Sequence, residues 1–226
     1  MKTIDTQTVY KQMLNAIDEL YGRAKTFQWQ DEATYANWLA QSFNYVSWTT
    51  RQLALASAMT KPGTEDSYHW RFIDEAREEK KHELLCLHDI KQLGYDVSMF
   101  PEFPHTAFFY QSLNYMIERE HPISLIGFSL TLEGFAATKL NEFYPIVKQA
   151  HGEKASTFLK LHCELDVDHF QNALPYLQAC PTELLPGVSK SISLCTAIYK
   201  GILDDITQYQ TKYPTAQRTG SVEKAI

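Results

Sequence analysis

The chain has 226 residues, 44% of them hydrophobic and 21% charged, with a formal net charge of −6. This size and composition are typical of one globular domain with a large core, so residues 1–226 are expected to form a single domain. The acidic balance, with no local cluster of Lys and Arg, argues against a protein that binds a nucleic-acid backbone.

Apolar side chains recur at helical spacing through most of the chain. In chain order, we expect helices over residues 5–24, 32–59, 64–93, 107–119, 122–150, 153–178 and 183–211, followed by a polar tail from about residue 213. Helix-breaking residues separate several of these segments, including Pro62-Gly63, Gly94, His121-Pro122 and Gly152. No segment shows the sustained alternation of a β-hairpin, so the predicted fold class is all-α, a bundle of about seven helices.

The most apolar segment, residues 122–138, approaches the length of a membrane span. It carries Glu133 well inside it, and no second segment of this kind occurs. A helix that is apolar on all sides is also typical of the centre of a core, so we expect a central core helix and no membrane.

The cysteines show no C-x-x-C pair and no regular spacing: Cys86, Cys163, Cys180 and Cys195. Residues 1–7 are polar and lack the apolar stretch of a signal peptide. Both features indicate a cytoplasmic protein with scattered reduced thiols.

The strongest candidate for chemistry is the group His162, Asp166 and His169. Spacings of four and three place these side chains on one helical face, together with apolar residues of the same helix. Burying each polar group without a partner costs roughly 2–7 kcal/mol, whereas a cation would satisfy all three. The two histidines lie ~10 Å apart along the helix axis, too far to share one ion, and Asp166 between them could bridge two. The spacing therefore favours a dinuclear metal site.

Two further candidates precede this group. Glu75 and His82 lie two helical turns apart, with Glu79 between them, and whether Glu79 replaces or supplements Glu75 stays open. Their charged neighbours, such as Glu78 and Lys80, are interpreted as a solvated face. Glu133 is a lone carboxylate in an apolar helix, which requires either a metal or a structural partner such as a core Tyr or Arg.

Together these positions supply carboxylates and imidazoles but no thiolate. Such a ligand set suits iron or manganese and tolerates zinc, while the absence of thiolates disfavours a structural zinc site.

As a set, the residues resemble the motif of the haem-oxygenase-like diiron oxidases and oxygenases. That motif is a Glu followed seven residues later by His, a Glu within Leu-Glu-Gly on an apolar helix, and then His-x-x-x-Asp-x-x-His. The matching residues are Glu75, His82, Glu133, His162, Asp166 and His169. The resemblance covers residues 70–170 directly, and the predicted helix order extends it to most of the chain.

The resemblance implies a seven-helix bundle, shared with TenA-type thiaminase II and with the quinone-cofactor oxidase of pyrroloquinoline biosynthesis. It also implies that two iron ions, or manganese or a mixed pair, activate O₂ at these six residues. The implied substrate is a small organic molecule that is amino-acid-like, fatty-acid-like or aromatic. The resemblance also implies a homodimer.

Other functions fit the residues less well. Haem oxygenase needs a histidine near the start of the chain, but the first one here is His69. A TenA-type thiaminase needs a nucleophilic cysteine on the central helices, and no cysteine lies between Cys86 and Cys163. A ferritin-like site would use Glu79-x-x-His82 and a first carboxylate, yet residues 33–64 contain neither Asp nor Glu. A metal-free bundle related to TenA, or one that binds a small ligand, stays open as the alternative.

Overall fold

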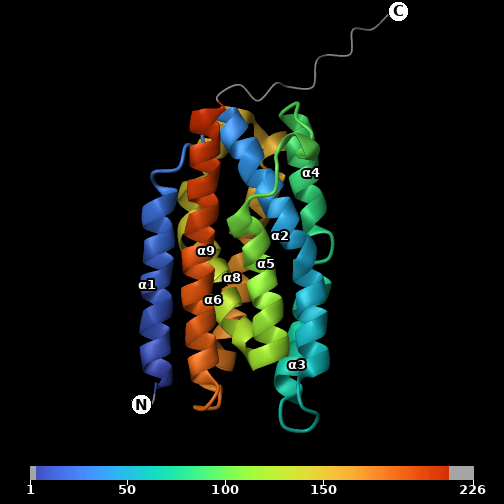
Figure 1. Ribbon diagram of the computed structural model, residues 1–226, viewed down its shortest axis with the longest axis vertical. Coiled ribbons are helices and arrows are strands. Elements are labelled where there is room, and N and C mark those ends of the chain that lie inside the picture. The colour runs from blue at the N-terminus through green and yellow to red at the C-terminus, as the bar shows by residue number, and fades with distance from the viewer. Residues whose placement is uncertain (1–3, 214–226) are drawn as a thin grey trace, which may run out of the picture.

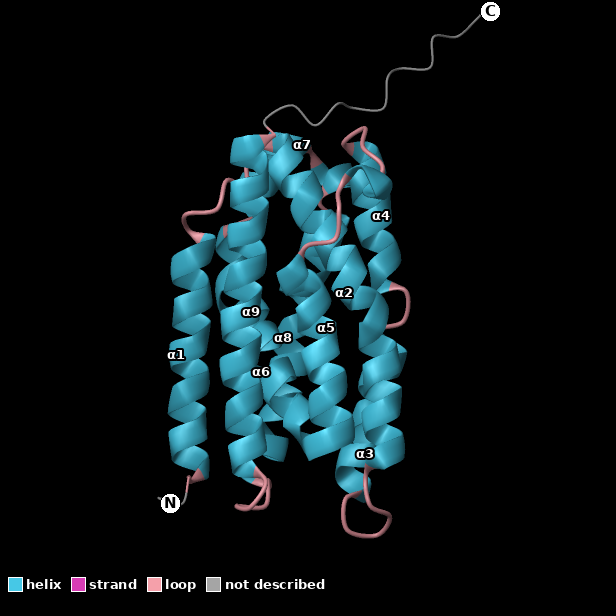
Figure 2. Cartoon of the chain, viewed as in Figure 1, coloured by secondary structure: helices cyan, strands magenta, loops and turns pink. Residues whose placement is uncertain are grey.

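The computed structural model describes residues 4–213, which form an elongated bundle of α-helices (Figures 1 and 2). The helices are α1 (Thr6–Ala24), α2 (Glu32–Met59), α3 (Asp66–Glu78), α4 (His82–Gln92), α5 (Pro104–Tyr115), α6 (Leu125–Lys139), α7 (Tyr144–His151), α8 (Thr157–Gln178) and α9 (Leu185–Lys212). The described residues contain no β-strand, which confirms the predicted all-α class. Residues 214–226 of the predicted polar tail lie outside the described residues.

The first two helices begin at side chains that cap them. The Asp5 carboxylate accepts a hydrogen bond from the Thr8 backbone N–H at 2.7 Å, and Asp31 accepts one from Thr34 at 2.8 Å. Each cap satisfies an N–H group that has no partner within its helix, which explains where these helices start.

Two of the predicted helices are broken. The segment predicted as one helix over residues 64–93 divides into α3 and α4, because Lys81 adopts a left-handed conformation with φ of 73°. The segment over residues 122–150 divides into α6 and α7 through a 3₁₀ turn, Leu140–Glu142. Pro145 in the first turn of α7 explains this second break, since proline cannot donate the hydrogen bond that would continue a helix.

Helix α6 lies at the centre of the bundle and packs against α8, α9 and α1. The run Pro122–Glu142 is apolar and long enough to cross a membrane, but 67% of its most apolar stretch is buried inside the protein. Glycines allow close contacts here: a Cβ on Gly127 would meet the Val188 carbonyl, and one on Gly134 would meet Phe170. This run is therefore the central core helix that the sequence predicted.

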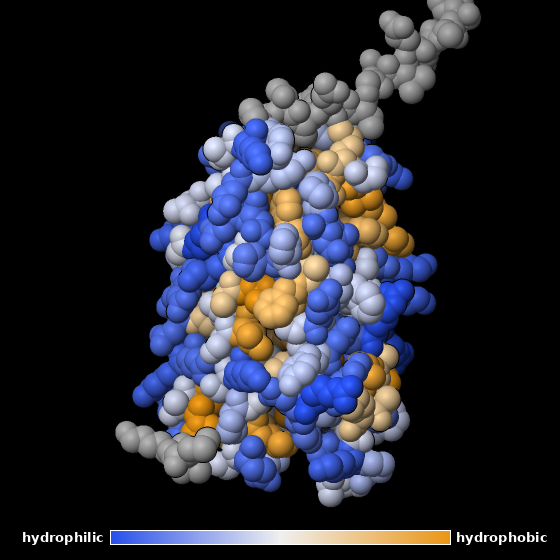
Figure 3. Space-filling model, viewed as in Figure 1, coloured by the Kyte–Doolittle hydropathy of each residue, from blue (hydrophilic) through white to orange (hydrophobic). Residues whose placement is uncertain are grey.

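The outer surface contrasts with this core. Figure 3 shows one face of the molecule, on which hydrophilic residues predominate and apolar residues form small separate patches. The large apolar side chains that are fully buried include Phe72, Phe109 and Leu130, from α3, α5 and α6. Large apolar side chains of these helices are thus buried inside the bundle.

Candidate metal centre

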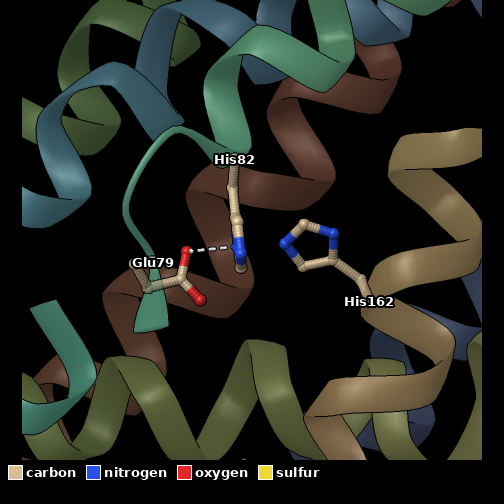
Figure 4. A group of neighbouring side chains, drawn as sticks. All are labelled: Glu79, His82 and His162. Atoms are coloured by element: carbon tan, nitrogen blue, oxygen red, sulfur yellow. Dashed lines mark ion pairs between the residues drawn. The ribbon is translucent and has the colours of Figure 1, made fainter. Parts of the chain in front are cut away.

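Three parts of the bundle bring the candidate ligands together. Glu75 lies on α3, Glu79 follows its last residue, and His82 begins α4. Glu133 lies on the central helix α6, while α8 carries the group of two histidines and Asp166. The break between α3 and α4 thus places Glu79 in a short connection, opposite α8 (Figure 4).

Glu79, His82 and His162 form the tightest cluster of donor atoms (Figure 4). One ligand atom from each lies within 4.8 Å of the other two. His82 Nδ1 lies 3.2 Å from Glu79 Oε2, and the two imidazole rings have centroids 5.4 Å apart. Two imidazoles and a carboxylate at this separation match the donor set of an iron or manganese site.

The orientation of His162 is fixed by its own helix. Its Nδ1 donates a hydrogen bond to the Phe158 carbonyl at 2.8 Å, and the Phe158 ring lies 4.3 Å from the imidazole between centroids. Because a carbonyl oxygen can only accept, Nδ1 carries a proton, so Nε2 is the ring nitrogen that can offer a lone pair to a cation. Such a backbone contact is the usual support of a metal-binding histidine.

The remaining candidates form a second group beside the first. The Ser129 hydroxyl donates to Glu75 Oε1 at 3.0 Å, which ties α6 to α3. His169 Nδ1 lies 3.3 Å from Asp166 Oδ1, and its Nε2 lies 3.1 Å from Glu78 Oε2. Glu78 is exposed, as the sequence predicted for a solvated face, but its carboxylate also pairs with a buried histidine on another helix.

A buried arginine also belongs to this region. Arg71 Nη2 lies 3.3 Å from Glu75 Oε2 and 3.8 Å from Glu133 Oε2. Arg71 was not among the predicted site residues, although its position four residues before Glu75 on one helix is a signal for an ion pair. Glu133 therefore has the core arginine partner that the sequence left open as an alternative to a metal, and the other candidate ligands lie beside this pair.

Burial and neighbouring charges shift the protonation of this group. Burial alone would raise the pKa of Glu79, but contact with His82 and the charge of His162 outweigh it and lower that pKa. Burial, followed by repulsion from Glu75, raises the pKa of Glu133 well above its usual value. The Asp166 contact raises the pKa of His169. Neighbouring carboxylates with opposed pKa shifts are typical of a functional site.

The unpaired atoms of the site fit a bound cation. Among the residues that the structure describes, buried side-chain atoms without a hydrogen bond include Glu75 Oε2, His82 Nδ1, Glu133 Oε2 and His169 Nδ1. Leaving buried polar atoms without a hydrogen bond is costly, and few native groups remain so without a functional reason. Metal ions held by these oxygen and nitrogen donors would satisfy them, so the residues fit a carboxylate- and histidine-ligated metal.

These side chains border a cavity of about 100 Å³. Its walls include the carboxylates Glu75, Glu79, Glu133 and Asp166 together with His162. The other walls are mainly aromatic and aliphatic, and they include Trp38, Tyr45, Phe128, Leu132, Phe158 and Tyr199. A metal at the cluster would therefore face a space that can hold a small organic molecule.

The structure thus brings all six predicted ligands into one region. The tightest cluster, however, pairs His82 with Glu79 and not with Glu75, whose neighbours are Ser129 and Arg71. The helical periodicity that grouped Glu75 with His82 fails because the helix between them is broken at residues 79–81.

Comparison with known proteins agrees with this picture. Residues 36–199 match the sequence model of a family described as iron-containing redox enzymes. No curated protein matches the chain. A domain of unknown function with a haem-oxygenase-like fold from Shewanella denitrificans superposes with a TM-score of 0.80 at 19% identity, covering 95% of this chain and 97% of that one.

A TenA homologue from Pseudomonas syringae pv. tomato superposes with a TM-score of 0.74 at 13% identity, covering 92% of this chain and 97% of that one. At these identities the two structures establish the fold alone, and that fold is the one the resemblance implied. The family match spans well over half of the chain, including all six predicted ligands. The chain therefore belongs to the iron-containing redox enzyme family and has a haem-oxygenase-like fold.

Proposed function

We propose that this protein is a non-haem dinuclear-iron enzyme that uses O₂ to oxidise a small organic substrate. The observation that carries the proposal is the cluster of Glu79, His82 and His162, whose donor atoms lie within 4.8 Å of one another beside a cavity. The family supports iron as the metal, with manganese or a mixed pair as the variants that the same donors accept.

The residues divide between two metal positions. Glu79, His82 and His162 would hold the first ion. Glu75, Glu133, Asp166 and His169 would hold the second, and they contribute most of the negative charge. Bound iron would supply redox chemistry and a binding position for O₂, while the protein fixes the ligands and leaves coordination positions open.

The cavity walls suggest how the chain handles its substrate. Trp38, Phe128 and Tyr199 offer apolar surface that excludes water and holds the apolar part of a small molecule. No Lys or Arg occurs among the described residues that line the cavity. These walls favour an aromatic or aliphatic substrate over one whose free carboxylate needs a cationic side chain as its partner.

The cysteine-dependent alternative has less support. All four cysteines are buried and free. Burial raises the pKa of the Cys163 thiol to about 12 and that of Cys180 to about 11, and it raises the pKa of Cys86 well above the usual range. A thiol protonated at neutral pH is a poor nucleophile, so a thiaminase-like reaction lacks its nucleophile here. The same free thiols support a reducing, cytoplasmic location.

Anaerobic reconstitution with ferrous iron tests the proposal. We expect two irons per chain, a transient absorption in the visible range on exposure to O₂, and loss of at least one iron in Asp166→Ala. The matched control is Asp168→Ala, which removes an exposed carboxylate from the same helix and should retain both irons. Wild-type protein that binds no iron, or Asp166→Ala with full iron content and unchanged O₂ reactivity, would refute the assignment.

A further inference from the structure

Arg71 lies inside the group of residues proposed to hold the second metal ion. Its side chain is only 7% exposed, and it contacts carboxylates from two different helices, Glu75 on α3 and Glu133 on α6. A buried arginine between two carboxylates offsets their charges in the way that a metal cation would. Arg71 and a second metal ion therefore compete for the same negative charges.

The contacts of Arg71 are unusually loose for a buried ion pair. Arg71 Nε and Nη2 lack hydrogen bonds, as do the facing oxygens Glu75 Oε2 and Glu133 Oε2, among the described residues. Buried arginine–carboxylate pairs are normally held by short, often bidentate hydrogen bonds. Charge, and not a fitted set of hydrogen bonds, holds this guanidinium in place.

Another arginine in the same chain shows what a fitted site looks like. Arg23 donates to Asp204 Oδ1 at 2.6 Å, to the Leu203 carbonyl at 2.8 Å and to the Thr207 hydroxyl at 2.8 Å. All three acceptors lie on one helix, α9, so this guanidinium locks α1 against α9. Within residues 4–213, Arg71 Nε and Nη2 donate no such hydrogen bonds, which makes Arg71 the more easily displaced of the two arginines.

We propose that Arg71 is a built-in cation that holds the place of the second metal ion and makes the two positions unequal in affinity. This inference rests on the proposed dinuclear site. The ion pairs of Arg71 among the described residues are with Glu75 and Glu133, so the first position, Glu79 with His82 and His162, fills first. The second fills only when Arg71 releases Glu75 and Glu133, so its affinity is lowered by the cost of breaking those pairs.

Such an arrangement has a clear physical use. Two neighbouring buried carboxyl groups such as Glu75 and Glu133 are both ionised at an acceptable cost only when a positive charge lies beside them. Arg71 supplies a positive charge while the protein holds no metal or one ion. The chain can therefore fold before the site is complete, at the expense of affinity for the second ion.

Stepwise metal binding tests the proposal. We would titrate the full chain with Mn²⁺ alone, measuring bound ions by equilibrium dialysis and the magnetic coupling of adjacent ions by electron paramagnetic resonance. Wild-type protein should show two affinities at least tenfold apart, with coupling only after the weaker position fills. Arg71→Met should tighten the second position at least tenfold and leave the first unchanged, whereas Arg71→Lys, which retains the charge, should keep two separate affinities.

Arg77→Met is the matched control, because Arg77 lies on the same helix but is exposed at the surface beside Asp74. It should behave as wild type. Two ions that bind wild-type protein with equal affinity, or an Arg71→Met variant whose second affinity is unchanged or weaker, would overturn the role of Arg71 and leave the dinuclear site intact. Binding of no ion to either protein would overturn both proposals.

A crystal structure of the wild-type protein with both positions filled by Mn²⁺ tests whether the second ion displaces Arg71. This experiment does not depend on the folding of a variant. We expect the Arg71 guanidinium to have withdrawn from Glu75 and Glu133. Persistence of both pairs with two ions bound would contradict the proposal.

Discussion

The imidazole rings of His82 and His162 meet edge to face, with centroids 5.4 Å apart and an angle of 81° between their planes. They come from different helices, α4 and α8, and Glu79 completes the cluster from the connection before α4. Because His162 Nδ1 is engaged by the Phe158 carbonyl, its Nε2 is the atom that remains for a metal. This pair of histidines joins two separate parts of the chain at the candidate centre.

His162→Ala should therefore remove the first metal position. At one equivalent of ferrous iron per chain, we expect the variant to retain little iron, because the remaining position is the one in which Arg71 competes. Iron analysis after gel filtration measures this, with far-ultraviolet circular dichroism to show that the fold is kept. His88→Ala removes an exposed histidine of α4 and should bind iron as wild type does; equal iron in both variants would contradict the prediction.

The conformation of Lys81 should control the geometry of the same centre. Lys81 is the only described residue other than glycine with a positive φ, at 73°, and it immediately precedes His82. A β-branched side chain is strained in this conformation, so Lys81→Val should lower stability by about 1–2 kcal/mol and weaken Mn²⁺ binding. Lys81→Gly should be tolerated, because glycine adopts this conformation freely.

Lys80→Val is the control for the Lys81 prediction, since Lys80 is exposed and has no positive φ. Denaturant unfolding and Mn²⁺ affinity are the measurements. If valine at the two positions has the same effect on both quantities, the left-handed residue has no special part in placing His82.

Sequence reasoning succeeded where the signal is local. Helix α2 occupies Glu32–Met59, the predicted segment 32–59, because an aspartate caps its start and a Pro-Gly turn follows its end. The break between α3 and α4 carries neither proline nor glycine, so periodicity continued the helix through it. The group on α8 was also recognisable, because spacings of three and four within one helix fix which side chains share a face.

The contacts between side chains on different helices could not be predicted from the sequence. Spacing could suggest that Arg71 pairs with Glu75, but its second contact, with Glu133 on α6, depends on how two helices pack. The same holds for Glu79, whose partners His82 and His162 become neighbours only through the break in the helix and the approach of α8. Periodicity gives the face of a residue on its own helix, and it does not give the neighbours that face meets.

The close approach of α6 to α9 provides a test of the core. A Cβ at Gly127 would collide with the Val188 carbonyl of α9, which is backbone and cannot rotate away. We expect Gly127→Ala to lower the free energy of unfolding by about 1–3 kcal/mol, the usual cost of overpacking. Gly22→Ala is the matched control: a Cβ there meets nothing within 4 Å, so alanine in this helix should raise stability by about 0.5–1 kcal/mol. Urea midpoints compare the two, and equal shifts would rule out the steric account.

A final prediction concerns Asp89, which links α4 to the helix that carries the predicted ligand group. Its fully buried carboxylate accepts hydrogen bonds from the Thr157 hydroxyl at 2.5 Å and the Phe158 N–H at 2.9 Å, in the first turn of α8. The side chain of Ser156, which precedes α8, makes no capping hydrogen bond. Asp89 on α4 therefore caps the start of α8. Burial raises the pKa of Asp89 to about 6 despite these hydrogen bonds.

Because its pKa is higher in the folded protein than in the unfolded chain, Asp89 binds its proton more tightly when folded. Its contribution to stability is therefore complete below about pH 4 and is lost as the pH rises through about 6. Asp89→Asn cannot titrate, so the stability of the variant relative to wild type should rise by about 1–3 kcal/mol between pH 4 and 7.

Thermal or urea unfolding across this pH range is the measurement for Asp89→Asn. Asp96→Asn is the control, because hydrogen bonds from Ser98 lower the pKa of Asp96, the opposite of the shift at Asp89. The stability of Asp96→Asn relative to wild type should change little between pH 5 and 7, since that carboxylate is ionised in both the folded and the unfolded chain there, and its contribution is lost only as the pH falls below about 4. If both variants follow the same trend with pH, burial does not govern the titration of Asp89, and its part in holding α4 against α8 would have to rest on its hydrogen bonds alone.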